Sequence, residues 1–171
     1  MVTLGIDAST TTIGWSFFSD KLLDCGFLDI KKIDTNKEKA YHFIDFIKNK
    51  EIFKDVSNIV LEAALSGYAG GMTSQQTIIK LVRWNAVFEY ILREEFEMDR
   101  NVHLLGVNTI RKNVFGKCRI AGMKSKEFVK FNVNNMVPEI SDFIILNRRG
   151  NPDKRNEDTY DAVTCSMYNF N

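Results

Sequence analysis

Residues 2–18, VTLGIDASTTTIGWSFF, carry the pattern from which the fold is predicted. Residues 2–7 form a short apolar run that ends on the carboxylate of Asp7, which is typical of a buried strand. A threonine-rich turn follows, and residues 13–18 resume with β-branched and aromatic side chains that favour a second strand. Residues 22–30 continue as a third strand. The segment therefore predicts a three-stranded antiparallel meander with Asp7 at the end of its first strand.

Helical and strand patterns alternate after this meander. Residues 58–62 predict a compact strand that ends on Glu62, and residues 102–107 predict a fifth strand. A long helix is expected between them, over residues 73–97. Its apolar positions cover more than one narrow stripe, which burial against the sheet and against a second subunit would explain. The predicted order, βββ-α-β-α-β-α-α-α, indicates an α/β fold with a mixed five-stranded sheet and helices on both faces.

Length and composition limit the class of protein. The chain has 171 residues, 44% of them hydrophobic and 26% charged, which is typical of a single globular domain spanning residues 1–171. No apolar run approaches ~20 residues, so no membrane partner is expected, and the N-terminus does not resemble a signal peptide. The three cysteines are far apart, which disfavours a disulfide framework or a zinc site. A cytoplasmic location is expected.

The net charge of +1 hides an uneven distribution of basic residues. Residues 100–126 contain several Lys and Arg and no Asp or Glu. A second basic cluster consists of Arg148, Arg149, Lys154 and Arg155. Such local asymmetry suits a polyanionic partner, although a solvated, lysine-rich surface would give the same pattern.

Four carboxylates are the candidate chemical centre. Asp7 and Glu62 each end a predicted strand, and strand ends are where α/β sheets commonly place ligand sites. Asp158 and Asp161 are three residues apart on the predicted last helix and so share a face. Taken singly, each residue has an ordinary explanation as a turn residue, a solvated strand end or a helix-start acid. Their order on strand, strand and helix is what suggests one site.

Clustered carboxylates repel one another, and a hard divalent cation relieves that repulsion. Mg²⁺ prefers oxygen ligands in octahedral geometry. Two such ions ~4 Å apart can promote attack of water on a phosphodiester and stabilise the leaving 3′-oxygen. The pattern therefore predicts metal-dependent phosphodiester hydrolysis with Asp7, Glu62, Asp158 and Asp161 as metal ligands and catalytic residues.

The same motifs resemble those of RuvC-type Holliday junction resolvases over nearly the whole chain. GIDASTTTIG at residues 5–14 is similar to the first motif of that family, IVLE at 59–62 to the second, and DTYDA at 158–162 to the terminal acidic pair. Residues 107–125, with Thr109, Lys112, Lys117 and Lys124, are similar to its threonine–basic helix and glycine–lysine loop. Ala8-Ser9 replaces the usual Pro-Gly. The many Lys and Asn and few Pro look more like phage or viral relatives, which would place the protein in the host-cell cytoplasm.

The resemblance implies an RNase H-like fold, a homodimer formed through helix 73–97, and cleavage of branched DNA. It implies Mg²⁺ as cofactor, with Mn²⁺ able to substitute and two ions in each active site. Lys124 is the predicted catalytic lysine near the scissile phosphate, and Tyr68, which could also simply pack its loop, is predicted to stack on an unpaired base. The other predicted DNA contacts are Thr109, Arg111, Lys112, Lys117, Arg119 and Lys126.

Three alternatives remain open on the sequence. A related RNase H-like nuclease could act on flaps or RNA–DNA hybrids, since substrate choice depends on loops and dimer geometry. Gly5-Ile-Asp7 followed by Thr10–Thr12 also looks like the phosphate-binding turn of actin-like ATPases, but those proteins need two such domains. A non-catalytic binding module would not need all four carboxylates.

Overall fold

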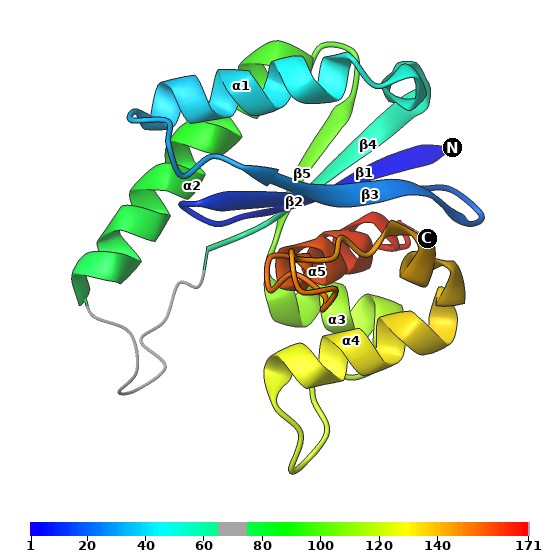
Figure 1. Ribbon diagram of the computed structural model, residues 1–171. Coiled ribbons are helices and arrows are strands. Elements are labelled where there is room, and N and C mark those ends of the chain that lie inside the picture. The colour runs from blue at the N-terminus through cyan, green and yellow to red at the C-terminus, as the bar shows by residue number, and fades with distance from the viewer. Residues whose placement is uncertain (65–74, 171) are drawn as a thin grey trace.

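A five-stranded mixed sheet forms the centre of the computed structural model, which describes residues 1–64 and 75–170 (Figure 1). The strands lie in the order β3-β2-β1-β4-β5. β1 (Val2–Ala8), β2 (Thr12–Phe18) and β3 (Leu22–Asp29) form the antiparallel meander. β4 (Val56–Glu62) pairs in parallel with β1, and β5 (Asn101–Leu105) pairs in parallel with β4. The predicted α/β fold with a mixed five-stranded sheet is confirmed.

Helices cover both faces of this sheet, as the sequence predicts (Figure 1). One face carries α1 (Asn36–Lys48) and α2 (Gln75–Phe96). The opposite face carries α3 (Val107–Phe115), α4 (Ser125–Met136) and α5 (Asn156–Ser166). Two short 3₁₀ helices, η1 (Glu51–Asp55) and η2 (Pro138–Phe143), precede β4 and follow α4. Within the described residues, no helix combines the length and apolarity that a membrane span needs.

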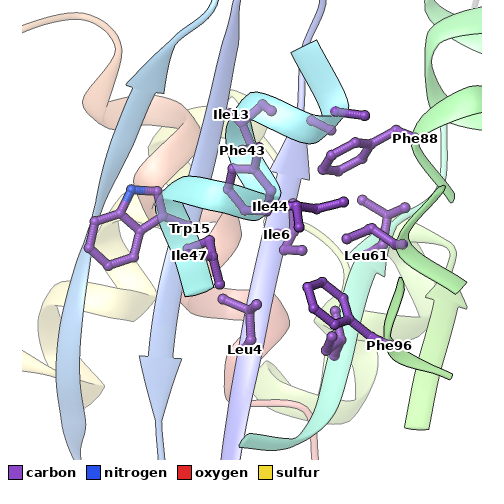
Figure 2. Close-up of a cluster of buried hydrophobic side chains, with 14 of the residues drawn as sticks. Leu4, Ile6, Ile13, Trp15, Phe43, Ile44, Ile47, Leu61, Phe88 and Phe96 are labelled. Atoms are coloured by element: carbon purple, nitrogen blue, oxygen red, sulfur yellow. The ribbon is translucent and has the colours of Figure 1, made fainter. Parts of the chain in front are cut away.

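The α1–α2 face is a dense apolar core (Figure 2). The rings of Phe43 and Phe88 meet edge-on at 5.4 Å between centroids, and Trp84 stacks on Phe88 at 4.9 Å. Two polar atoms of α2 also reach the sheet, because Trp84 Nε1 and Asn85 Nδ2 each donate to the Ala8 carbonyl at 3.2 Å. These bonds tie α2 to the end of β1, one residue after Asp7.

On the opposite face, α5 lies directly against the backbone of β1 and β2. A Cβ added at Gly5 would come within 2.1 Å of the Ala162 carbonyl oxygen, and one at Gly14 within 2.0 Å of the Asp158 carbonyl oxygen. Real Cβ atoms do not approach other atoms so closely. The missing side chains of two glycines therefore set the height of α5 above the sheet.

Apolar packing joins the remaining helices to α5. Phe128 and Val133 of α4 belong to one buried cluster with Tyr160 and Val163 of α5. Ile110 of α3 packs in a smaller cluster with residues of β4 and α5. The α3, α4 and α5 helices thus form one packed layer.

The close approach at Gly14 predicts the effect of adding one methyl group there. Gly14→Ala should destabilise the protein by about 1–3 kcal/mol, since an overpacked contact forces backbone movement. Gly106→Ala is the control, because the added Cβ would meet nothing within 4 Å and the Gly106 φ of −69° suits any residue. Urea unfolding of both variants measures the difference. Equal stability of Gly14→Ala and the parent protein would contradict the close approach.

Candidate active site

Asp7 and Glu62 lie together at one edge of the sheet because β1 and β4 are parallel neighbours. Ile6 pairs with Leu61 in this register, so the two carboxylates follow on adjacent strand ends. The turn after Asp7 is closed by Ser9, whose hydroxyl donates to the Thr12 carbonyl at 2.8 Å and accepts from the Thr12 amide at 3.0 Å. The carboxylates of Asp7 and Glu62 therefore project from two adjacent strand ends.

Asp158 and Asp161 reach the same edge from the first turns of α5. Gly14, over which the Asp158 backbone lies, is the β2 residue that pairs with Asp7. The side chain of Asp158 is 19% exposed and that of Asp161 is 8% exposed. All four predicted carboxylates therefore meet in one partly buried cluster, which we call the acidic centre.

Two basic side chains face this acidic centre. Arg111 of α3 is buried, and its guanidinium donates to Asp161 Oδ1 at 3.3 Å and to Ser125 Oγ at 2.7 Å. Lys126 of α4 is about half exposed, and its Nζ lies 3.3 Å from Asp161 Oδ2 and 3.7 Å from Asp158 Oδ1. One cation is thus fixed inside the protein, whereas the other faces solvent.

The electrostatics of the cluster show that its charges are only partly balanced. Burial, followed by repulsion from Glu62 and Asp161, raises the pKa of Asp7 well above its usual range. Burial and then Asp161 raise the pKa of Glu62 to about 7, against the opposing effect of Arg111 and Lys126. Burial also raises the pKa of Asp158. Burial lowers the pKa of Lys126, but the surrounding carboxylates outweigh it and the net shift is upward.

The donor set suits a hard divalent cation. Four carboxylate side chains gather there, and repulsion between them adds to burial in raising the pKa of Asp7 and Glu62, a repulsion that a bound cation would relieve. Within residues 1–64 and 75–170, however, no three Asp, Glu, His or Cys side chains already converge as a ligand group. The two oxygens of Asp161 are paired with Arg111 and Lys126. Each oxygen of an ionised carboxylate has a further lone pair, so Asp161 could accept a cation beside these partners or in place of Lys126.

The structure separates the predicted DNA contacts into two groups. Thr109, Lys112, Lys117 and Arg119 are exposed on α3 and on the loop that follows it. Arg111, also predicted as a DNA contact, is a buried partner of Asp161. The residues around Arg111 in the sequence do not indicate this role, because the role depends on contact with Asp161 of α5. Tyr68 and the start of the predicted helix 73–97 lie outside the described residues.

Two lysines at the start of α4 differ in their placement. Lys124, the predicted catalytic lysine, is exposed and precedes α4 as its N-cap, where its backbone amide donates to Glu127 Oε2 at 3.3 Å. Lys126, predicted only as a DNA contact, is the lysine that the structure brings to the acidic centre. Sequence spacing did not distinguish them, since both follow the same glycine-containing loop.

Comparisons with known proteins bear on the fold. No family model and no curated protein matches the chain. Among solved structures, Thermus thermophilus RuvC in complex with a Holliday junction is 15% identical with a TM-score of 0.64, and the match covers 98% of this chain and 91% of that one. The yeast mitochondrial Holliday junction resolvase Ydc2 is 11% identical with a TM-score of 0.61, over 96% and 75% of the two chains.

The fowlpox virus resolvase, solved with its Holliday junction substrate, is 12% identical with a TM-score of 0.51, over 98% and 95% of the chains. At such identities the likeness shows the fold, and this fold is RuvC-like. Because bacterial, mitochondrial and viral proteins are all similar to the chain, the phage-like branch stays a prediction.

The raised pKa of Glu62 predicts a pH-dependent stability in metal-free buffer. A carboxyl that titrates near 7 when folded and near 4.5 when unfolded binds more protons in the folded state. It therefore stabilises the fold below about pH 4.5, and this contribution is lost as the pH rises through 7. Glu62→Gln removes the titration, so its stability relative to the parent should increase by roughly 1–3 kcal/mol over this range.

Thermal or urea unfolding in EDTA between pH 4.5 and 8 measures this difference. Glu94→Gln, an exposed carboxylate of α2, is the matched control and should show no comparable trend. A pH-independent difference between Glu62→Gln and the parent protein would mean that Glu62 does not titrate in a buried, repulsive cluster.

Proposed function

We propose that the protein is a divalent-metal-dependent endonuclease that cuts four-way DNA junctions and other branched DNA. The observation that carries this proposal is the acidic centre itself. Carboxylates from β1, β4 and α5 are gathered at one sheet edge, next to a half-exposed lysine, on a RuvC-like fold. The neighbours of similar fold include proteins whose structures contain Holliday junction DNA, which supports a branched substrate.

Asp7, Glu62, Asp158 and Asp161 would hold Mg²⁺, or Mn²⁺ in its place, with two ions in each site. When bound, the metal would supply Lewis acidity that promotes attack of water on phosphorus and stabilises the leaving 3′-oxygen, leaving a 5′-phosphate. The carboxylates would also fix the position of the scissile phosphate, because the cations that they hold would attract its negative charge. Because the four carboxylates stand on two strands and a helix, and not on a long loop, their own positions are well defined.

The basic residues have separate tasks in this proposal. Arg111, held by Ser125 and Asp161, orients the Asp161 carboxylate. Lys126 can leave its carboxylate partners and donate to a non-bridging phosphate oxygen, since its side chain is 51% exposed. The exposed residues Thr109, Lys112, Lys117 and Arg119 would contact phosphates farther along the DNA, so affinity should fall steeply with salt.

The described part of the long helix supports a homodimer. Ile79, Val82 and Tyr90 of α2 are 47%, 45% and 65% exposed, and with Ala86 they form a stripe at helical spacing. Trp84, Phe88 and Leu92 point the other way, into the core. An apolar stripe opposite the core is what the equivalent helix of a second copy would cover.

The central test is cleavage of a synthetic four-way junction in Mg²⁺ by the parent protein and by Asp7→Asn. The variant keeps the shape of the side chain and removes its charge, so it should bind the junction as tightly as the parent in gel-shift titrations. Its cleavage rate should fall by at least about 100-fold, because several kcal/mol of charge stabilisation are lost. Normal cleavage by Asp7→Asn would show that the acidic centre is not the catalytic one.

The same assay decides between substrate classes. Flaps, Y-forks, RNA–DNA hybrids and linear duplexes are compared with the junction at equal concentration, and the junction should be cut fastest. Preference for a hybrid or a flap would replace the junction with that substrate while keeping the chemistry. Absence of cleavage together with calorimetric binding of ATP would favour an actin-like phosphate-binding domain.

A second comparison concerns the two lysines of the α4 start. Lys126→Ala should lower the single-turnover rate of junction cleavage about 10–100-fold and change junction affinity little, since one charge-assisted hydrogen bond contributes ~1.5–3 kcal/mol. Lys124→Ala, the residue favoured by the sequence, is the matched variant and should affect mainly affinity. The reverse order of effects would restore Lys124 as the catalytic lysine.

The dimer is tested on the exposed stripe of α2. Val82→Glu should shift sedimentation from dimer to monomer, because burying an unpaired carboxylate at an interface is costly. Lys80→Glu places the same acid on the flank of the helix and should leave the dimer intact. A monomeric parent protein at micromolar concentration would exclude this interface.

A further inference from the structure

A cavity of about 680 Å³ opens beside the acidic centre. It lies between α4, η2, the segment that precedes α5, and the first turns of α5. Two of its lining residues, Lys126 and Asp161, also belong to the acidic centre. A group bound at the carboxylates would therefore be continuous with a group in the cavity. The volume of the cavity is in the range of sites that bind small organic ligands.

The walls of this cavity are mainly apolar. The apolar lining residues are Val129, Pro138, Ile144, Pro152 and Tyr160. The ring of Tyr160 is held in place, because its hydroxyl donates to Asn134 Oδ1 at 3.0 Å. Asn134 and Ser141 add polar groups among the lining residues. Apolar and aromatic walls with a few hydrogen-bonding groups are surroundings in which proteins hold an unstacked nucleobase.

The segment before α5 contains a turn over residues 145–152, of which Pro152 lines the cavity. Leu146 and Pro152 form an isolated antiparallel bridge. Inside the turn, Asn147 Oδ1 accepts from the backbone amides of Arg149 at 2.8 Å and Asn151 at 3.3 Å. At its base, Asn156 Oδ1 accepts from the Ile145 amide at 3.2 Å. The wall is therefore formed by the protein itself before any ligand arrives.

Charged side chains of both signs line the cavity. Lys130 and Lys154 are basic lining residues besides Lys126, and Glu127, Asp153 and Glu157 are acidic ones. Arg148 and Arg149, on the turn before α5, are exposed. By contrast, Arg155 is engaged within the protein, since it donates to Asp153 and Asp29. The basic cluster of residues 148–155 thus divides into one structural arginine and several exposed cations suited to phosphates.

We propose that this cavity receives the base of one unstacked nucleotide of the cleaved strand, next to the phosphodiester at the acidic centre. The inference rests on the proposed function. Bases at a branch point have lost a stacking neighbour, so unstacking one more base there costs less than in a continuous duplex. The base lies between Tyr160 and the apolar walls, and its flanking phosphates face Lys130 and Lys154. The cavity then selects strands that can give up a base near the cut.

The first test fills the cavity from its exposed rim. Ser141→Trp should lower the single-turnover rate of junction cleavage by about 5–150-fold, the factor that corresponds to base stacking of ~1–3 kcal/mol. Asp142→Trp, an exposed neighbour that does not line the cavity, should cleave like the parent. Ser141→Ala removes the hydroxyl bond to the Pro138 carbonyl without filling the cavity, so its cleavage rate should fall less than that of Ser141→Trp.

The second test removes the base that would enter the cavity and leaves the cavity itself unchanged. Junctions carry a single abasic site at each position around the cut, one position per substrate. The cleavage rate of the parent protein should fall by a similar factor at one position only. The cleavage rate of Ser141→Trp should not change when the base at that position is removed. Because this comparison uses the parent protein, its result is valid even if Ser141→Trp does not fold.

An active parent that cuts every abasic junction equally well, with Ser141→Trp as fast as the parent, overturns the cavity proposal alone. A parent that cuts no branched DNA in Mg²⁺ overturns the proposed function and the cavity proposal together. The two failures are distinguishable because only the second abolishes parent activity.

Discussion

The contact on which the rest of the site depends is the direct seating of α5 on the sheet at Gly5 and Gly14. An ordinary helix on a sheet is held off by side chains, whereas here the carbonyls of Ala162 and Asp158 occupy the places where two Cβ atoms would be. The shared hydrogen bond between the Ser16 and Ser166 hydroxyls holds the far end of α5 at the same height. Asp158 and Asp161 consequently reach Asp7 and Glu62 from above, although the pairs are far apart in sequence. Any side chain in these contacts would lift the helix and open the acidic centre.

This seating brings like charges together, and the protein balances them unequally. Arg111 is buried and has two acceptors, so it acts as a permanent part of the structure. Lys126 faces solvent and touches the carboxylates from outside, so its partners can change. Burial and mutual repulsion still keep the pKa of Asp7 and Glu62 high. Such a centre favours the arrival of positive charge, which is the physical basis of the proposed metal site.

The two faces of the sheet have different roles. The α1–α2 face holds most of the large buried aromatic side chains (Figure 2). It leaves an apolar stripe of α2 exposed, on which the proposed pairing with a second copy depends. The α3–α5 face supplies the helical carboxylates, both cations and the neighbouring cavity. The Ala8 carbonyl links the faces, because α2 donates to it next to Asp7. Packing on one side thus stabilises the strand end on which the proposed chemistry of the other side depends.

The sequence by itself determined the order of the elements, the mixed sheet and the four carboxylates that meet at the sheet edge. These features follow from local periodicity and from strand ends, which are encoded within short windows. Only the tertiary structure decided which basic residues join them. Lys126 rather than Lys124 reaches Asp161, because Lys124 precedes α4 while Lys126 lies on its first turn. Arg111 is buried and the cavity exists because α3, α4, η2 and α5 pack together, and such contacts between distant segments leave no mark in the spacing of residues along the chain.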